Sequence, residues 1–220
     1  MNFAQKIAKE STITFSGMVH GNINRYIYTA LLARWVGVEY LGIYSLANAI
    51  MLISEVIAKM GLETGVMRFV SRLEPQTEMP QIQKIIASSL KMTGISSVGM
   101  AILLASFSWI FVSFFKGAPL LQTAIVVFSL TIPFNVITFV SAYATQGFKL
   151  LKYKVFTTQF LNPIIMLVAM VISYLFISKE STIILPMAIT GVLGSITMFS
   201  ILKNVSGIKL MSVLSAPIDR

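Results

Sequence analysis

Residues 120–143 read LLQTAIVVFSLTIPFNVITFVSAY, an apolar stretch of 24 positions with no charged side chain. A transmembrane helix needs about 20 mostly apolar residues to cross the hydrocarbon core of a bilayer. A transmembrane strand would need only about ten residues of alternating polarity, whereas this stretch is continuous and longer. The segment therefore predicts a helix that spans a membrane.

Five further stretches of similar composition occur along the chain. Hydrophobic residues make up 56% of the 220 positions, charged residues make up 11%, and the mean hydropathy is +0.82. A soluble domain carries about 25% charged residues, and one of this size could not bury so many large apolar side chains. We therefore predict an all-α, polytopic membrane protein with a single six-helix transmembrane bundle over residues 1–220. Its helices are predicted at Thr12–Ala33, Leu41–Lys59, Thr93–Phe115, Leu120–Tyr143, Val155–Ile177 and Ile183–Leu202.

The lysines and arginines between these stretches predict the orientation of the bundle, because cytoplasmic loops carry an excess of both. With a cytoplasmic N-terminus, 12 of these cations fall in cytoplasmic segments and three in outer loops. We therefore predict that both termini are cytoplasmic and that the cations face membrane lipids of the inner leaflet. This clustering argues against nucleic acid, which a net charge of +9 would otherwise suggest as a partner. The cytoplasmic set is Lys6, Lys9, Arg68, Arg72, Lys84, Lys91, Lys149, Lys152, Lys154, Lys203, Lys209 and Arg220, and the outer set is Arg34, Lys116 and Lys179.

Prolines predict where the helices break or bend. Pro75 and Pro80 separate two amphipathic pieces in the longest predicted cytoplasmic segment, residues 60–92. We predict that this segment is an extension of the second helix, a turn, and a short surface helix that leads into the third span. Pro133 and Pro163 lie inside later predicted helices, where each removes a backbone donor and predicts a packing bend or a hinge.

The first predicted helix has a polar face within the membrane. At about 100° per residue, His20, Asn24 and Tyr28 fall on one side of this helix. Gly17 and Gly21 fall on the same side, at a spacing that permits a neighbouring helix to approach closely. We assign the three polar residues as candidate substrate-binding residues.

Arg25 belongs to the same face and is the candidate that carries charge. A charge near the middle of a membrane costs roughly 2.5–3.5 kcal/mol on insertion scales, so a cavity, a partner or a ligand is expected to compensate for it. A guanidinium offers a planar fork of donors that suits phosphate, so we interpret Arg25 as lining a hydrated cavity and binding an anionic group. The alternative is that Arg25 caps carbonyls or pairs with a carboxylate such as Glu55. His20 is interpreted as a packed, hydrogen-bonded group, with a proton relay as its alternative.

The second predicted helix carries Glu55 and Lys59 four residues apart, with Asn48 on the same face. In this order the two charges can form an ion pair that removes most of the cost of their burial. We interpret them as neutralising one another near the cytoplasmic end, with a gate or an ion-coupling element as the alternative. Asn48 joins the candidate substrate-binding residues.

Several classes of function have no supporting motif. The chain has no cysteine and one histidine, which excludes thiolate and polyhistidine metal sites. It has no Gly-rich phosphate loop, no HExxH and no GxSxG. We therefore expect no enzymatic activity, no metal and no cofactor, and we expect any transport to draw on an ion gradient, the membrane potential or the substrate's own gradient.

Three stretches of the chain resemble the polysaccharide flippases, the O-antigen and capsule repeat-unit translocases of the multidrug/oligosaccharidyl-lipid/polysaccharide exporter superfamily. They are LLARWVGVEYLGIYSLANAI at residues 31–50, MGLETGVMRFVSR at residues 60–72 and YATQGFKLLKYKVF at residues 143–156. Together they point to the superfamily and not to one substrate. The matching elements in the first two stretches are Ala33, Arg34, Gly37, Tyr40, Gly42, Tyr44, Gly61, Leu62, Arg68 and Phe69.

The resemblance implies a substrate and a larger assembly. Flippases of this family have 12 to 14 helices in two six-helix halves, and this chain is similar to the N-terminal half. We expect a truncated product or fragment, with a missing second half or a second copy of the chain as the partner that completes a pathway. The implied substrate is a polyprenyl-diphosphate-linked oligosaccharide, moved from the inner to the outer leaflet of a bacterial or archaeal cytoplasmic membrane. Related flippases hold the diphosphate with arginines, a role that the resemblance implies for Arg25.

Two other functions remain open at this stage. A multidrug or cation antiporter of the same superfamily would need a carboxylate deep in a cavity, for which Glu55 is the candidate. An envelope or spore-coat assembly protein would bind partners without transport and would need neither group in a cavity. A flippase needs Arg25 to face a wet cavity.

Overall fold

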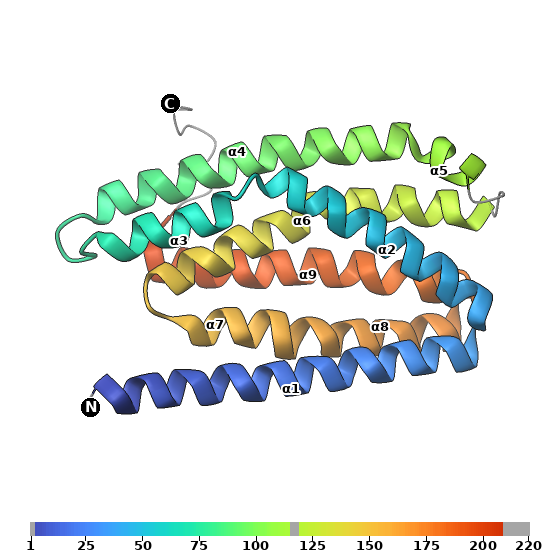
Figure 1. Ribbon diagram of the computed structural model, residues 1–220, viewed down its shortest axis with the longest axis horizontal. Helices are drawn as coiled ribbons and strands as arrows, with labels where there is room; N and C mark the ends of the chain where they lie inside the picture. The colour runs from blue at the N-terminus through green and yellow to red at the C-terminus, as the bar shows by residue number, and fades with distance from the viewer. Residues whose placement is uncertain (1–2, 115–118, 209–220) are drawn as a thin grey trace.

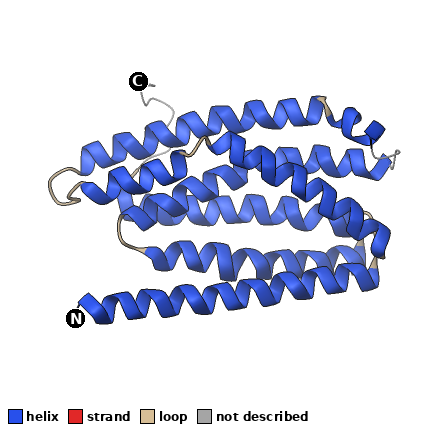
Figure 2. Ribbon diagram, in the orientation of Figure 1, coloured by secondary structure: helices blue, strands red, loops and turns tan. Residues whose placement is uncertain are grey.

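The structure is a computed structural model that describes residues 3–114 and 119–208. The described residues form helices joined by short loops, without a strand among them (Figure 2). The all-α prediction is therefore confirmed. The helices are α1 (Phe3–Trp35), α2 (Val38–Lys59), α3 (Leu62–Arg72), α4 (Met79–Ser106), α5 (Ser108–Phe114), α6 (Pro119–Gly147), α7 (Leu151–Val155), the π-helix η1 (Phe156–Leu161), α8 (Asn162–Phe176) and α9 (Ser181–Ser206).

Five helical segments of the described chain are long and apolar enough to cross a membrane. They are α2, α4, α6, the continuous run Leu151–Phe176, and α9. The chain is therefore a multi-pass membrane protein. At about 1.5 Å per residue, the 33 residues of α1 also exceed the length of a span. Its polar residues keep α1 out of this apolar set, so the sixth span remains a prediction.

Helix α6 forms the centre of the bundle. It contacts α2, α3, α4 and α9 along its length, and it carries no charged residue. Phe128, Ile132, Val136 and Val140 follow one another at intervals of four and are fully buried. A helix that is apolar all round is either a core helix or a membrane span, and the contacts of α6 with four other helices place it in the interior of the bundle.

The two ends of the bundle differ in charge. The start of α1, the turn between α3 and α4, the turn between α6 and α7, and the end of α9 all lie at one end (Figure 1). Most of the cations that we predict to be cytoplasmic flank these segments, so we call this the basic end. The turns after α1 and α8 lie at the opposite end (Figure 1). This arrangement agrees with the alternation of charge in the sequence, and the side of the membrane remains a prediction.

The extension of the second helix is a separate helix, contrary to our prediction. Met60 and Gly61 both have left-handed backbone conformations, with φ of 52° and 73°, so α2 ends at Lys59 and α3 starts in a new direction. The short surface helix is also not a separate element. It is continuous with the third span, and α4 begins at Met79 with Pro80 in its first turn, where a proline is tolerated.

The predicted bend at Pro163 takes the form of a π-helix. Residues 156–161 adopt this conformation immediately before α8, which has Pro163 in its first turn. A π-helical turn within a transmembrane segment often marks a functional site. By contrast, Pro133 lies inside the continuous helix α6.

The crossing of α3 and α6 depends on Gly147. A Cβ atom at this position would lie 2.8 Å from Cβ of Val70, which is a contact too short to be relieved by rotating a side chain. We expect Gly147→Ala to destabilise the protein by about 1–3 kcal/mol, as overpacking does. Gly65→Ala in α3 is the matched control, because nothing lies within 4 Å of its added Cβ and the helix gains up to about 1 kcal/mol. Thermal unfolding in detergent should show opposite shifts for the two variants, and equal shifts would contradict this packing.

Orientation can be tested with single cysteines, because the chain has none of its own. We expect a membrane-impermeant thiol reagent to label Lys152→Cys only from the cytoplasmic side of sealed vesicles. Lys179→Cys, in the turn before α9, should label only from the outer side. Labelling of both cysteines from the same side would contradict the predicted topology.

Candidate functional site

A cavity of about 210 Å³ lies between α1, α2 and α8. It brings together four of the five predicted substrate-binding residues, namely Asn24, Arg25, Tyr28 and Asn48. The fifth, His20, lies outside the lining and contacts one of its members. The remaining lining residues are Thr29, Tyr44, Pro163 and Met166.

The turn between α1 and α2 places these residues opposite one another. Gly37 has a φ of 113°, a conformation that favours glycine, and it reverses the chain between the two helices. The rings of Tyr28 and Tyr44 then meet with centroids 5.4 Å apart. The ring of Tyr44 also meets that of Phe128 edge-on at 6.0 Å, which anchors the wall of the cavity to the buried face of α6.

Arg25 is exposed in the wall of this cavity. Within the described residues, no carboxylate oxygen lies within 4.0 Å of its guanidinium. The alternative pairing of Arg25 with Glu55 is therefore not the arrangement in the structure. The guanidinium can offer its donors to an anionic group in the cavity.

The hydroxyl of Tyr28 has no hydrogen-bond partner, although this residue is only 3% exposed. A buried hydroxyl without a partner loses the hydrogen bonds that water would give it. Because Tyr28 lines the cavity beside Asn24 and Asn48, a polar ligand bound there could supply the missing partner. This residue and the two amides add neutral hydrogen-bonding groups to the charge of Arg25.

His20 supports the cavity from one side. Nδ2 of Asn24 lies 2.9 Å from Nε2 of His20 and also donates to the His20 carbonyl at 2.8 Å. The His20 ring stacks on that of Phe160 in η1, with centroids 4.5 Å apart. His20 is thus a packed, hydrogen-bonded group that positions Asn24.

The glycines of the polar face allow α1 to approach η1 closely. A Cβ at Gly17 would collide with a methyl group of Val155, and one at Gly21 would collide with Oε1 of Gln159. The GxxxG spacing therefore serves a contact within the chain, between α1 and the α7–η1 segment.

Glu55 and Lys59 do not form the predicted ion pair with each other. Glu55 is 2% exposed, and its Oε1 accepts a hydrogen bond of 2.6 Å from Nδ2 of Asn135 in α6. Nζ of Lys59 instead lies 3.8 Å from Oε1 of Glu63 in α3 and 4.5 Å from the centroid of the Phe139 ring. The turn at Met60 and Gly61 brings α3 within reach of Lys59. Neither Glu55 nor Lys59 lines the Arg25 cavity.

Asn135 is the partner that sequence reasoning missed. It is an amide in the middle of a span that carries no charged residue, which is the available signal, and it bonds a buried carboxylate on a neighbouring helix. Among the described residues, no group of three His, Asp or Glu side chains could hold a metal ion.

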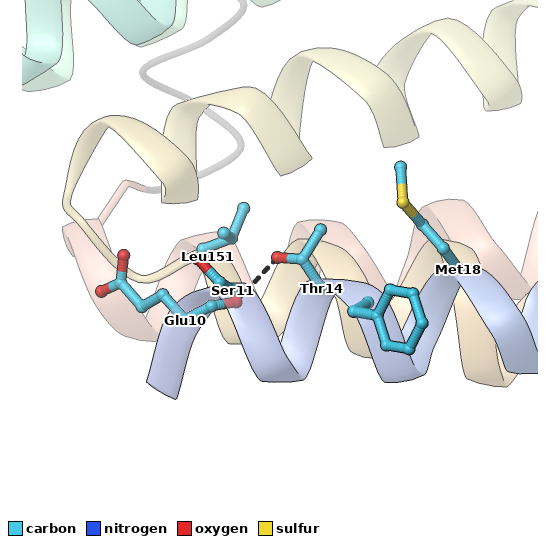
Figure 3. A pocket seen from close by; sticks show the side chains of 6 residues that line it. Glu10, Ser11, Thr14, Met18 and Leu151 are labelled. Atoms are coloured by element: carbon cyan, nitrogen blue, oxygen red, sulfur yellow. Dashed lines mark hydrogen bonds between the residues drawn. The ribbon is translucent and has the colours of Figure 1, made fainter. Parts of the chain in front are cut away.

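A second cavity, of about 410 Å³, lies beside α1 toward the basic end (Figure 3). It is lined by Glu10, Ser11, Thr14, Phe15 and Met18 of α1, and by Leu151 of α7. The Thr14 hydroxyl donates to the Glu10 carbonyl at 2.9 Å, within α1. At 100° per residue, Thr14 and Met18 lie on the same side of α1 as Arg25. This side of the helix therefore joins the second cavity to the Arg25 cavity.

The fold and the cavity define a class, that of multi-pass helical membrane proteins with a polar, cationic site between their helices. A sequence profile described as polysaccharide biosynthesis protein matches residues 7–212. The chain belongs to this family, which agrees with the resemblance seen in its motifs. No curated protein sequence and no solved structure matches the chain.

The unpartnered hydroxyl of Tyr28 gives a prediction for stability. We expect Tyr28→Phe to change the free energy of unfolding by less than about 1 kcal/mol, because no hydrogen bond is lost. Asn135→Leu is the contrasting variant, since it removes the donor to a buried carboxylate and should cost about 1–3 kcal/mol or more. Thermal unfolding in detergent measures both. A large loss for Tyr28→Phe would mean that its hydroxyl has a partner within the protein.

Proposed function

We propose that the protein is a flippase that translocates a polyprenyl-diphosphate-linked oligosaccharide across the cytoplasmic membrane for surface polysaccharide biosynthesis. The observation that carries this proposal is Arg25, an exposed guanidinium that has no carboxylate partner among the described residues and lies in the wall of a cavity between α1, α2 and α8. The proposed class is transport and not an enzymatic reaction, and no cofactor takes part.

The cavity suits the charged part of such a lipid. Arg25 can bind a phosphate oxygen pair through two parallel N–H bonds. Asn24, Asn48 and Tyr28 can bind further phosphate oxygens or the hydroxyls of the first sugar. Pockets for drug-sized ligands measure about 300–1,000 Å³. The cavity of about 210 Å³ is smaller than these pockets, so it holds one phosphate or sugar group at a time. The lipid tail would stay in the bilayer.

The exposure of Arg25 also supports a partner. A charge at membrane depth requires water or protein around it, because lipid cannot compensate for it. We propose that water fills the space beside Arg25 and that another helical bundle, from a second copy or another chain, closes it. The pathway would then run along the side of α1 that carries Thr14, Met18 and Arg25.

The alternatives place different residues in a cavity. A cation antiporter would use Glu55, but this side chain is buried against Asn135 and away from the Arg25 cavity. A scaffold protein would need no charge at membrane depth. The position of Arg25 therefore favours the flippase over both alternatives.

Replacement of Arg25 tests the proposal. In cells that depend on this protein, we expect Arg25→Ala to abolish surface polysaccharide while leaving membrane insertion intact. Arg25→Lys keeps the charge but loses the planar fork, so it should export less than the native protein and more than Arg25→Ala.

The matched control is Arg72→Ala, which removes an exposed arginine at the end of α3. This variant should export normally, because Arg72 does not line the Arg25 cavity and lies beside the α3–α4 turn at the basic end of the bundle. Normal export by Arg25→Ala, with the protein present in the membrane at its usual level, would refute the role of Arg25 in translocation.

A further inference from the structure

A groove of about 420 Å³ lies on the flank of the bundle, between α1, α7–η1 and α9. We call it the flank groove. It shares no lining residue with the Arg25 cavity. Five of its seven lining residues are aliphatic or phenylalanine, and none is acidic. They are Ile13, Lys152, Tyr153, Val155, Phe156, Phe160 and Ile201.

Charge and apolar surface follow a fixed order along the groove. Lys152, Phe156 and Phe160 are spaced four residues apart and all line the groove, so they follow one another along the α7–η1 segment. Lys152 is exposed at the basic end, with its Nζ 4.8 Å from the centroid of the Tyr153 ring. The Phe156 ring is half-exposed, and that of Phe160 lies deeper, against His20.

This order matches the chemistry of an anionic phospholipid in the leaflet at the basic end. Such a lipid has its phosphate at the membrane surface and its acyl chains directed toward the middle of the bilayer. A lysine close to the surface attracts an anionic headgroup, and the apolar side chains below it accommodate a chain. Lys149 and Lys203 flank the same end of the groove in sequence, and they add positive potential there.

We propose that the flank groove is a binding site for one anionic phospholipid. Its phosphate binds Lys152, and one acyl chain lies against Phe156, Phe160 and Ile13.

The bound lipid can affect the Arg25 cavity through a chain of side-chain contacts. Phe160 is a wall of the groove, and its opposite contact is the stacked ring of His20. His20 in turn holds Asn24, which lines the cavity. A chain pressed against Phe160 therefore favours the orientation of Asn24 that the structure shows. This regulatory part of the inference rests on the proposed function, whereas lipid binding does not.

Native mass spectrometry of the full chain, with phosphatidylglycerol or phosphatidylcholine added at equal concentration, tests the binding. We expect the native protein to retain one phosphatidylglycerol in preference to phosphatidylcholine. Lys152→Gln should lower this preference about fivefold, the contribution of one lysine near an anionic surface. Lys179→Gln, at an exposed position in the turn before α9 at the opposite end of the bundle, should keep it. Lys152→Arg should keep it as well.

Equal retention of the two lipids by the native protein, an unchanged preference in Lys152→Gln, or displacement of the bound lipid by millimolar inorganic phosphate would each overturn the site. Displacement would do so because the groove would then hold the anion without its chain. Since Lys152 is exposed, its variants should fold, and an unchanged thermal midpoint checks this.

The regulatory part has its own readout. Transport of a lipid-linked oligosaccharide by native protein should be faster in vesicles containing phosphatidylglycerol than in phosphatidylcholine alone, and Lys152→Gln should remove this difference. If retention follows the expected pattern while transport shows no lipid dependence, the lipid site stands and the link through Phe160 and His20 fails. If Arg25→Ala also exports normally, the proposed function fails separately from the lipid site.

Discussion

Inside a bilayer no water is available to the backbone, so every peptide group must find its partner within the protein. The described chain meets this constraint with helices and short connections at the two ends of the bundle. Hydroxyl side chains follow the same rule locally. Thr93, Thr145 and Ser206 each donate to a backbone carbonyl three or four residues earlier, at 2.7–2.8 Å. These local bonds satisfy most of the hydroxyl side chains. Hydrogen bonds between side chains of different helices are therefore easy to recognise.

One such contact and one cavity show that the polar residues of the bundle have different roles. The bond from Asn135 to Glu55 joins α6 to α2, and it gives a donor to a buried carboxylate oxygen. At the Arg25 cavity the guanidinium stays exposed, and the Tyr28 hydroxyl beside it is buried without a hydrogen-bond partner. A buried carboxylate with a donor contributes to the stability of the bundle, whereas open donors at membrane depth leave room for a ligand. The same kinds of side chain therefore support structure at one place and binding at another.

Much of the fold and half of the site could be predicted from the sequence. The spans follow from uninterrupted apolar runs, and the binding face of α1 follows from its regular period, because α1 is one unbroken helix from Phe3 to Trp35. The partner of Lys59 could not be predicted in this way. The i, i+4 rule pairs it with Glu55, but the helix ends at Lys59, and two left-handed residues bring Glu63 close instead. The polar groups that meet across helices, such as Glu55 and Asn135, depend on how α2 and α6 cross, which no local pattern contains.

The π-helix changes the directions in which side chains point around the helix axis along the segment from Leu151 to Phe176. Its turn closes from residue i to i+5, so it contains one residue more than an α-helical turn. One residue corresponds to about 100° of rotation. Compared with a regular α-helix, the side chains before Phe156 are therefore rotated by roughly a quarter turn relative to those after Leu161. A helical wheel drawn across the whole segment as a regular α-helix would therefore misplace the side chains of α7 relative to those of α8. Loss of a single residue between 156 and 161 would turn the lysines of α7 toward different neighbours without altering the hydropathy of the span.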